Sequence, residues 1–273
     1  MDPGGVVVTT EDLNYFRDLE ARGIQLSDGQ KAWWIKKYQT LGDRMFRENP
    51  SYPEEAFKAS LVGAYYGRTV TEMRRKGRVG NVPHEVGFPV DTFWDLRMND
   101  AMCIWFCQTI GRERRIIDYF SASGEGMAYY ANVLKEKGYS YGIHYMPHDA
   151  NVRELGTGEK RSDVAMRLGI TPINMVPRPK STDQLLDQID ETRRFLETCW
   201  INESTCDSGD KSGLKCLESY RKEWDDKLGD FKTTPLHNWA SHGADAFRTG
   251  AVGCSNRRVE DQDDLEPDYV GWA

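Results

Sequence analysis

Three aspartates stand at positions from which their carboxylates could share one site. Asp95 ends one predicted strand, Asp149 ends another, and Asp245 lies in the last predicted helix. Functional groups often gather at the carboxyl ends of strands in α/β sheets. Aspartate oxygens suit Mg²⁺ or Mn²⁺, and two such ions can neutralise a phosphate, activate water and stabilise a leaving oxygen. These residues predict two-metal-ion phosphodiester hydrolysis, with Asp100 as a possible fourth ligand.

Other interpretations of the same residues stay open. Asp100 can equally be a turn residue, and His148 can be a loop histidine that hydrogen-bonds to the backbone. His148 and Asp149 could instead join His237 and His242 in a zinc site, although histidines near helix ends more often serve packing. A structural α/β domain whose aspartates do not meet is the plainest alternative.

The stretch before and after Asp95 predicts an antiparallel meander. Residues 90–95 alternate in polarity, so the side chain of Asp95 should point to the face opposite Trp94. Residues 102–110 are apolar almost throughout, as expected of a central strand covered on both faces. A polar turn follows, and residues 115–120 return as a third strand.

The rest of the chain predicts alternating helices and strands. We expect helices at 125–137, 162–168 and 182–200, strands at 141–146 and 173–176, helical residues at 214–224, a loop at 225–235 and a last helix at 238–248. Two helices should open the chain, the second capped at Ser27. The predicted fold class is therefore α/β, with a mixed central sheet (an antiparallel meander plus parallel strands) flanked by helices.

Composition narrows the class of protein. The 273 residues are 39% hydrophobic and 29% charged, which is typical of a folded chain. No apolar run approaches the ~20 residues that cross a bilayer, and the first residues do not resemble a signal peptide, so we expect a cytoplasmic protein with no membrane partner. Six cysteines without a C-x-x-C pair predict reduced thiols.

The net charge of −7 is unlike that of a simple DNA-binding domain, so any contact with nucleic acid should come from local basic clusters. Two clusters could bind phosphates without sequence preference. The candidate residues are Arg74, Arg75, Lys76 and Arg78 before the first strand, and Arg112, Arg114 and Arg115 after the second. The alternative is that both clusters are ordinary solvated turns.

Composition shifts suggest three segments. We expect a first segment at residues 1–80, a main domain at 81–252, and an acidic, mobile tail at 253–273. Residues 259–273 contain six acidic side chains and no basic one.

Four stretches give the chain a family resemblance. They read LSDGQKAWW at residues 26–34, YPEEAF at 52–57, TFWDL at 92–96 and HGADAFR at 242–248. In their order and spacing they resemble the C-terminal part of the large terminase subunit of tailed bacteriophages, the motor and nuclease that packages DNA. The second stretch is similar to the segment that closes the ATPase region of that family, and the fourth to its last acidic helix.

The resemblance implies a fold, an activity and partners. It implies a ribonuclease-H-like endonuclease that cuts concatemeric viral double-stranded DNA with two Mg²⁺ or Mn²⁺ ions held by Asp95, Asp149 and Asp245. Residues 1–80 would be a remnant of the end of the ATPase motor region. The implied partners are the ATPase region, the small terminase subunit and the capsid portal, and the implied place is the host cytoplasm.

Two features depart from the family pattern. Arg97 stands two residues after Asp95, where the family often has glycine, and its charge could contact DNA. No phosphate-binding G-x-x-x-x-G-K-[ST] loop occurs in the sequence, so we expect no ATPase activity from this chain alone. Two alternative functions remain open: another ribonuclease-H-like nuclease such as a junction resolvase, and a non-cutting assembly module that docks on the portal through the tail.

Overall fold

The computed structural model describes residues 6–42, 44–53, 55, 62–96, 101–153, 158–225 and 227–263. These residues form two compact units, Met1–Gly63 and Ala64–Ala273. No helix among them is long and apolar enough to cross a bilayer. Arg97 and Asp100, two of the predicted site residues, lie outside the described residues.

The first unit is a small helical cluster. It contains α1 (Thr10–Ala21), α2 (Asp28–Leu41) and α3 (Arg44–Glu48). As predicted, Ser27 caps α2: its hydroxyl accepts from the Gln30 amide, and the Gln30 side chain accepts from the Ser27 amide in return. Trp34 lies in the core of this unit, stacked on Tyr15 with ring centroids 4.3 Å apart.

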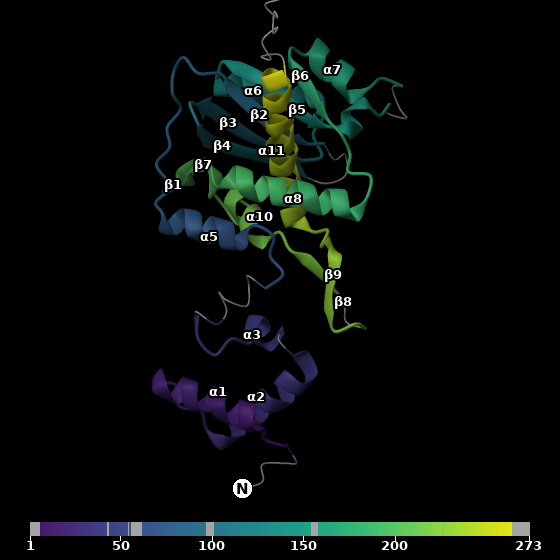
Figure 1. The fold of residues 1–273 in the computed structure, drawn as a ribbon. Coiled ribbons are helices and arrows are strands. Elements are labelled where there is room, and N and C mark those ends of the chain that lie inside the picture. Colours follow the sequence, from purple (N-terminus) through teal and green to yellow (C-terminus); the bar gives the residue numbers. More distant parts are fainter. Residues whose placement is uncertain are drawn as a thin grey trace, which may run out of the picture. The chain divides into compact units, whose positions relative to one another are not determined.

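The second unit is built on a sheet that has seven strands among the described residues (Figure 1). The strands are β1 (Val79–Gly80), β2 (Val90–Asp95), β3 (Ala101–Ile110), β4 (Glu113–Ser123), β5 (Tyr141–Pro147), β6 (Ile173–Val176) and β7 (Cys199–Asn202), in the spatial order β1-β7-β4-β3-β2-β5-β6. β2, β3 and β4 form the predicted antiparallel meander. β5 pairs with β2, and β6 pairs with β5, both in parallel. The strand order and directions confirm the predicted fold class, which is α/β with a mixed central sheet flanked by helices.

Helices cover both faces of the sheet. They are α5 (Gly67–Arg75), α6 (Met127–Lys137), the 3₁₀ helix η1 (His148–Asn151), α7 (Arg161–Arg167), α8 (Thr182–Leu196), α9 (Glu203–Cys206), α10 (Gly213–Ser219) and α11 (Trp239–Asp263). Figure 1 shows α8 and α11 crossing one face. Phe93 packs on that face and Trp94 on the other, with α6 and α7, which confirms the alternation predicted for β2.

We predicted a domain boundary at residue 80, but the helix α5 and the strand β1, which end at or before that residue, already belong to the second unit. The second unit begins at Ala64, and β1 pairs in parallel with β7 inside the central sheet. Tyr66, the N-cap residue of α5, and Val70 and Met73 of α5 are fully buried in the core of the second unit. Tertiary contacts made far along the chain therefore draw this segment into the main domain.

Two predicted helices are shorter than expected. The helix predicted to reach Trp200 ends at Leu196, because the guanidinium of Arg78 hydrogen-bonds to the carbonyls of Leu196 and Glu197, and the chain then enters β7. The helix predicted at 214–224 ends at Ser219. Residues that we expected in a loop form a hairpin instead, with the strands β8 (Lys222–Asp225) and β9 (Asp230–Pro235). In this hairpin the rings of Trp224 and Phe231 pack against each other, with their centroids 4.9 Å apart.

The last helix is longer than predicted. We expected the fold to end at residue 252, but α11 continues to Asp263. Gly250 and Gly253 explain the extension, since they let α11 lie against the sheet: a Cβ on Gly250 would come 1.9 Å from the Phe93 ring, and one on Gly253 would come 2.3 Å from the Tyr145 ring. Residues 253–263, which we assigned to the tail, are thus helical, and residues 264–273 lie outside the described part of the chain.

Candidate functional site

Asp95 is held at the carboxyl end of β2. It is the last residue of the strand, opposite Cys103 of β3, and only 6% of its surface is exposed. Its side chain lies on the face covered by α11, where Nδ1 of His242 is 3.5 Å from Asp95 Oδ2. Asp95 is therefore a buried carboxylate fixed between a strand end and a helix.

Asp149 reaches the same edge of the sheet from the neighbouring strand. β5 runs parallel to β2, with Phe93 beside Tyr145, so the carboxyl ends of the two strands lie together. Pro147 ends β5 in an extended conformation and η1 begins at the next residue. Asp149 is partly exposed, and its Oδ1 lies 2.9 Å from Nδ1 of His148.

Asp245 comes to this edge on α11. Its Oδ1 accepts a hydrogen bond from the Tyr220 hydroxyl at 3.2 Å and from Nη2 of Arg248 at 2.9 Å. Nη1 of the same arginine donates to Oε1 of Gln188 in α8 at 2.6 Å, which ties the two helices together. Burial, with the charge of Asp245, raises the pKa of Tyr220 well above its usual value, so this phenol stays protonated and can donate.

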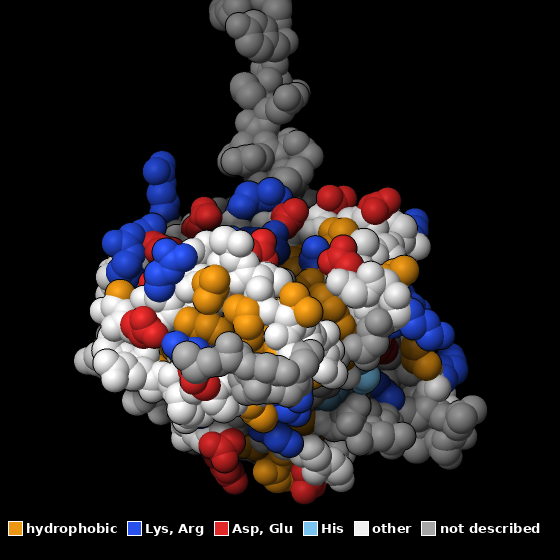
Figure 2. All heavy atoms as spheres, turned by 90° about the horizontal axis from the view of Figure 1, so that it is seen from below, with side chains coloured by type: hydrophobic (Ala, Val, Ile, Leu, Met, Phe, Trp, Pro, Cys, Tyr) orange, Lys and Arg blue, Asp and Glu red, His pale blue; other side chains and the backbone are white. Residues whose placement is uncertain are grey.

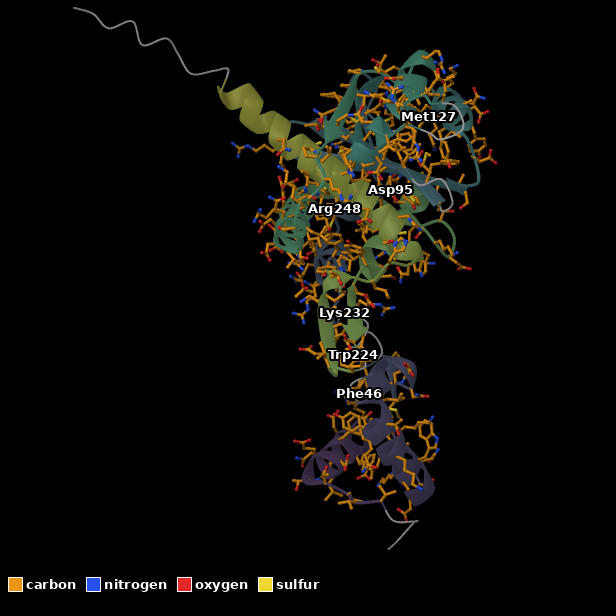
Figure 3. All side chains as sticks on the ribbon, turned by 90° about the vertical axis from the view of Figure 1, so that its right-hand side faces the viewer. Phe46, Asp95, Met127, Trp224, Lys232 and Arg248 are labelled. Carbon is orange, nitrogen blue, oxygen red and sulfur yellow. The ribbon has the colours of Figure 1, made fainter. Side chains whose placement is uncertain are left out.

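The three carboxylates line one pocket of about 350 Å³, which we call the aspartate pocket. Its wall is completed by residues 176–179, at and after the end of β6, and by α8 and α11. Figure 3 shows Asp95 beside the part of α11 that carries Arg248. The structure thus brings together Asp95, Asp149 and Asp245 from three separate stretches of the chain, although their roles in catalysis stay predictions.

The donor atoms of the aspartate pocket suit a hard divalent cation, since they are carboxylate oxygens. Among the described residues, however, no group of three or more His, Cys, Asp or Glu side chains is close enough to hold a metal ion. Asp149 is engaged with His148, and Asp245 with Arg248 and Tyr220. Binding of an ion would therefore require these carboxylates to change partners.

The alternative zinc site is not assembled. His148 and Asp149 line the aspartate pocket, whereas His237 and His242 line a separate pocket of about 490 Å³. The rings of His237 and His242 lie 5.6 Å apart and nearly perpendicular to each other. His242 thus lines this separate pocket and contacts Asp95, while His148 contacts Asp149.

In the first basic cluster, two arginines make internal contacts. Arg74 pairs with Glu203, Asp207 and Glu218, which lie 129 to 144 residues later in the chain. Arg78 donates to the backbone carbonyls after α8. Arg75 pairs with Glu72 on the surface, and Lys76 is exposed.

The second basic cluster is divided between different environments. Arg112 is exposed at the turn, and Arg115 pairs with Glu85 and Glu113. Arg114 is buried. None of the seven residues of the two clusters lines the aspartate pocket, and the face drawn in Figure 2 mixes basic and acidic side chains around a group of hydrophobic ones.

Sequence reasoning missed the arginines that do line the aspartate pocket. Arg248 could have been found, because it follows Asp245 by three residues and the two therefore share a helix face. Arg178 follows β6 and is exposed. Its position could also have been suspected, since it follows the carboxyl end of a strand parallel to β5.

No protein-family model and no curated protein matches the chain. Among solved structures it is similar to the large terminase of a thermophilic bacteriophage, with 12% identity and a TM-score of 0.49 over 80% of this chain and 59% of that one. It is also similar to the P22 large terminase nuclease domain, with 17% identity and a TM-score of 0.47 over 67% of this chain and 89% of that one. A third similar structure is the nuclease domain of the bacteriophage SPP1 large terminase with bound Mn, at 15% identity and a TM-score of 0.45, over 66% of this chain and 95% of that one. The chain thus spans 59% of the length of the first of these proteins.

Proposed function

We propose that the chain is a divalent-metal-dependent DNA endonuclease, the nuclease part of a large terminase subunit of a tailed bacteriophage. The observation that carries the proposal is the aspartate pocket, in which three carboxylates from β2, η1 and α11 meet at one edge of a ribonuclease-H-like sheet. The four sequence stretches that resemble the terminase family support it, because two of them contain Asp95 and Asp245.

Asp95, Asp149 and Asp245 would hold the two ions, Mg²⁺ or Mn²⁺. When bound, the ions would neutralise the charge of a phosphodiester, activate water and stabilise the departing oxygen. The chain itself would orient the site: Tyr220 donates to Asp245, and His242 lies against Asp95. Arg178, which forms no ion pair among the described residues, would contact a phosphate at the rim of the pocket.

In this proposal the substrate is concatemeric viral double-stranded DNA, and the partners are the ATPase region, the small terminase subunit and the portal. Residues 1–63, the first unit, would correspond to the end of the ATPase region and its linker. The place of action would be the host cytoplasm.

The test is cleavage of plasmid DNA in the presence of Mn²⁺ or Mg²⁺. Asp95→Asn should abolish cleavage while circular dichroism remains unchanged, and Asp187→Asn, at an exposed carboxylate on α8, should cleave like the unmodified chain. Cleavage by a well-folded Asp95→Asn variant would remove Asp95 from the mechanism. Four-way junctions and RNA–DNA hybrids, assayed beside linear duplex, test the resolvase alternative. Cleavage that needs no metal ion, or no cleavage of any of these substrates, would reject the proposal.

A further inference from the structure

A third pocket, distinct from the aspartate pocket and from the pocket lined by His237 and His242, lies at the opposite end of the sheet from the three aspartates. It has a volume of about 520 Å³ and lies where β2 and β5 begin, β3 ends and β4 begins. Asp91, Thr109, Arg114, Tyr141 and Gly142 are among the residues that line it. We call it the arginine pocket, because Arg114 is its one cationic lining residue among those described.

One nitrogen of the Arg114 guanidinium is buried without a polar partner among the described residues. Only 5% of the residue is exposed, and its Nη1 atom makes no hydrogen bond among the described residues. The guanidinium lies over the face of the Phe195 ring, whose centroid is 5.7 Å from Cζ. An aromatic face attracts a cation but accepts no conventional hydrogen bond from the five N–H groups of the arginine. A buried charge in this state is strongly unfavourable unless something else pairs with it.

The ionisable groups described next to Arg114 do not supply the missing charge. Burial raises the pKa of the Cys107 thiol and of the Cys199 thiol well above their usual range, even though the charge of Arg114 acts in the opposite direction, so both thiols are neutral at pH 7. Asp91 faces the same pocket, but its Oδ1 accepts the Ile143 amide at 2.7 Å, and no ion pair joins it to Arg114.

Thr109 adds a second donor beside Arg114. The two residues are direct partners in the register of β3 and β4, and both line the arginine pocket. Thr109 is exposed, and its hydroxyl has no hydrogen-bond partner within the described part of the chain. A guanidinium fork with an adjacent hydroxyl matches the oxygens of a carboxylate or a phosphate group.

We propose that the arginine pocket is a binding site for a small oxyanion, held by the guanidinium of Arg114 and the hydroxyl of Thr109. The ligand groups that fit these donors are a carboxylate and a phosphate. This site is independent of the proposed nuclease function, because none of its residues lines the aspartate pocket.

The test measures the melting temperature of the whole chain in acetate or in inorganic phosphate at mildly acidic pH, against chloride at the same ionic strength. Acetate or phosphate should raise Tm in a concentration-dependent way, since a ligand that binds only the folded state stabilises it. Arg114→Met should lose the rise. The control Arg115→Gln should keep it, because that arginine pairs with Glu85 and Glu113 outside this pocket. The stronger of the two anions identifies the ligand group.

Thr109→Val provides a second variant at an exposed position that should not disturb folding. Isothermal titration calorimetry with the stronger anion should then show an affinity at least severalfold weaker than that of the unmodified chain. The proposal is wrong if neither anion raises Tm beyond chloride. It is equally wrong if Arg114→Met keeps the full rise, if Arg115→Gln loses it, or if Thr109→Val binds the anion as tightly as the unmodified chain.

Discussion

Nδ1 of His242 lies 3.5 Å from Oδ2 of Asp95, and both side chains are buried. The contact joins α11 to the end of β2, three residues before Asp245 along the helix. An imidazole in this place can orient the carboxylate of Asp95, as outer partners of metal-binding carboxylates commonly do. His242 is therefore a positioning residue in the proposed nuclease.

Replacing His242 tests this role. His242→Ala should lower the rate of metal-dependent plasmid cleavage by about 10- to 100-fold, and should raise the Mn²⁺ concentration needed for half-maximal cleavage. His237→Ala is the matched control, because that imidazole lies in the same pocket and contacts the ring of His242. Equal losses in the two variants would show that the pocket as a whole matters, and not the contact with Asp95.

Arg248 occupies the place of a counter-ion for Asp245. Both side chains are largely buried, with Nη2 of the arginine 2.9 Å from Oδ1 of the aspartate. Removal of one partner leaves the other charge buried and uncompensated, so Arg248→Met should lower the free energy of unfolding by about 3–5 kcal/mol. Arg167→Met breaks an exposed pair with Glu159 and should change it little.

The same variant tests whether a divalent ion can replace the arginine. Mn²⁺ should raise the melting temperature of Arg248→Met more than that of the unmodified chain, since the freed carboxylate of Asp245 becomes available to the ion. Equal shifts in the two proteins would mean that Arg248 does not compete with the metal.

Gly250 sets the distance between α11 and the sheet. Gly250→Ala would place a Cβ 1.9 Å from the Phe93 ring, so the helix or the ring must move. We expect a loss of about 1–3 kcal/mol from overpacking, although alanine favours the helix by about 1 kcal/mol. Urea unfolding measures the change, with Gly80→Ala, where a Cβ meets nothing within 4 Å, as the control. An unchanged midpoint for Gly250→Ala would show that the close approach is not needed.

Local signals made most of the core of the second unit predictable. The apolar run at β3, the alternation in β2 and the left-handed Gly138 that ends α6 each depend on residues close in the chain. The placement of Asp95 and Asp149 at one edge followed from parallel strands. These features needed no knowledge of distant contacts.

The structure differs from the sequence-based expectations where distant contacts decide it. The DNA contacts of the two arginine clusters stay a prediction, but the partners of Arg74 lie more than 120 residues away, and nothing near Arg74 in the sequence points to them. The early end of α8 depends on Arg78 in the same way. The length of α11 depends on the rings that Gly250 and Gly253 meet on β2 and β5.

DNA binding should therefore depend on Arg178 more than on Arg74. Arg178→Gln removes an exposed charge at the rim of the aspartate pocket, and should reduce the slope of log affinity against log salt by about one. Arg74→Gln should instead lower stability, because three carboxylates lose their shared partner. Fluorescence anisotropy with a labelled duplex at several salt concentrations measures the slope. The assignment of Arg178 would fail if its variant kept the original slope.

His144 makes the stability of the sheet sensitive to acid. It is buried on β5, where its Nδ1 lies 2.6 Å from the hydroxyl of Thr92. That hydroxyl also accepts a hydrogen bond from the Trp94 indole at 2.6 Å, so it is set to donate its own proton to the neutral imidazole. Burial lowers the pKa of His144 from 6.5 to about 4, which means that the folded protein excludes a proton that the unfolded chain takes up.

The contribution of His144 to stability should be complete above pH 6.5 and should be lost as the pH falls from 6.5 towards 4. The difference between 6.5 and about 4 corresponds to about 3 kcal/mol over that interval. Urea unfolding at several pH values measures how the free energy of unfolding depends on pH. His144→Gln should reduce this dependence by the amount that uptake of nearly one proton on unfolding produces, whatever the stability of the variant itself. The control Thr109→Val, with no change in a titratable group, should keep the original slope. A slope in His144→Gln as steep as in the unmodified chain would assign the acid sensitivity to other groups.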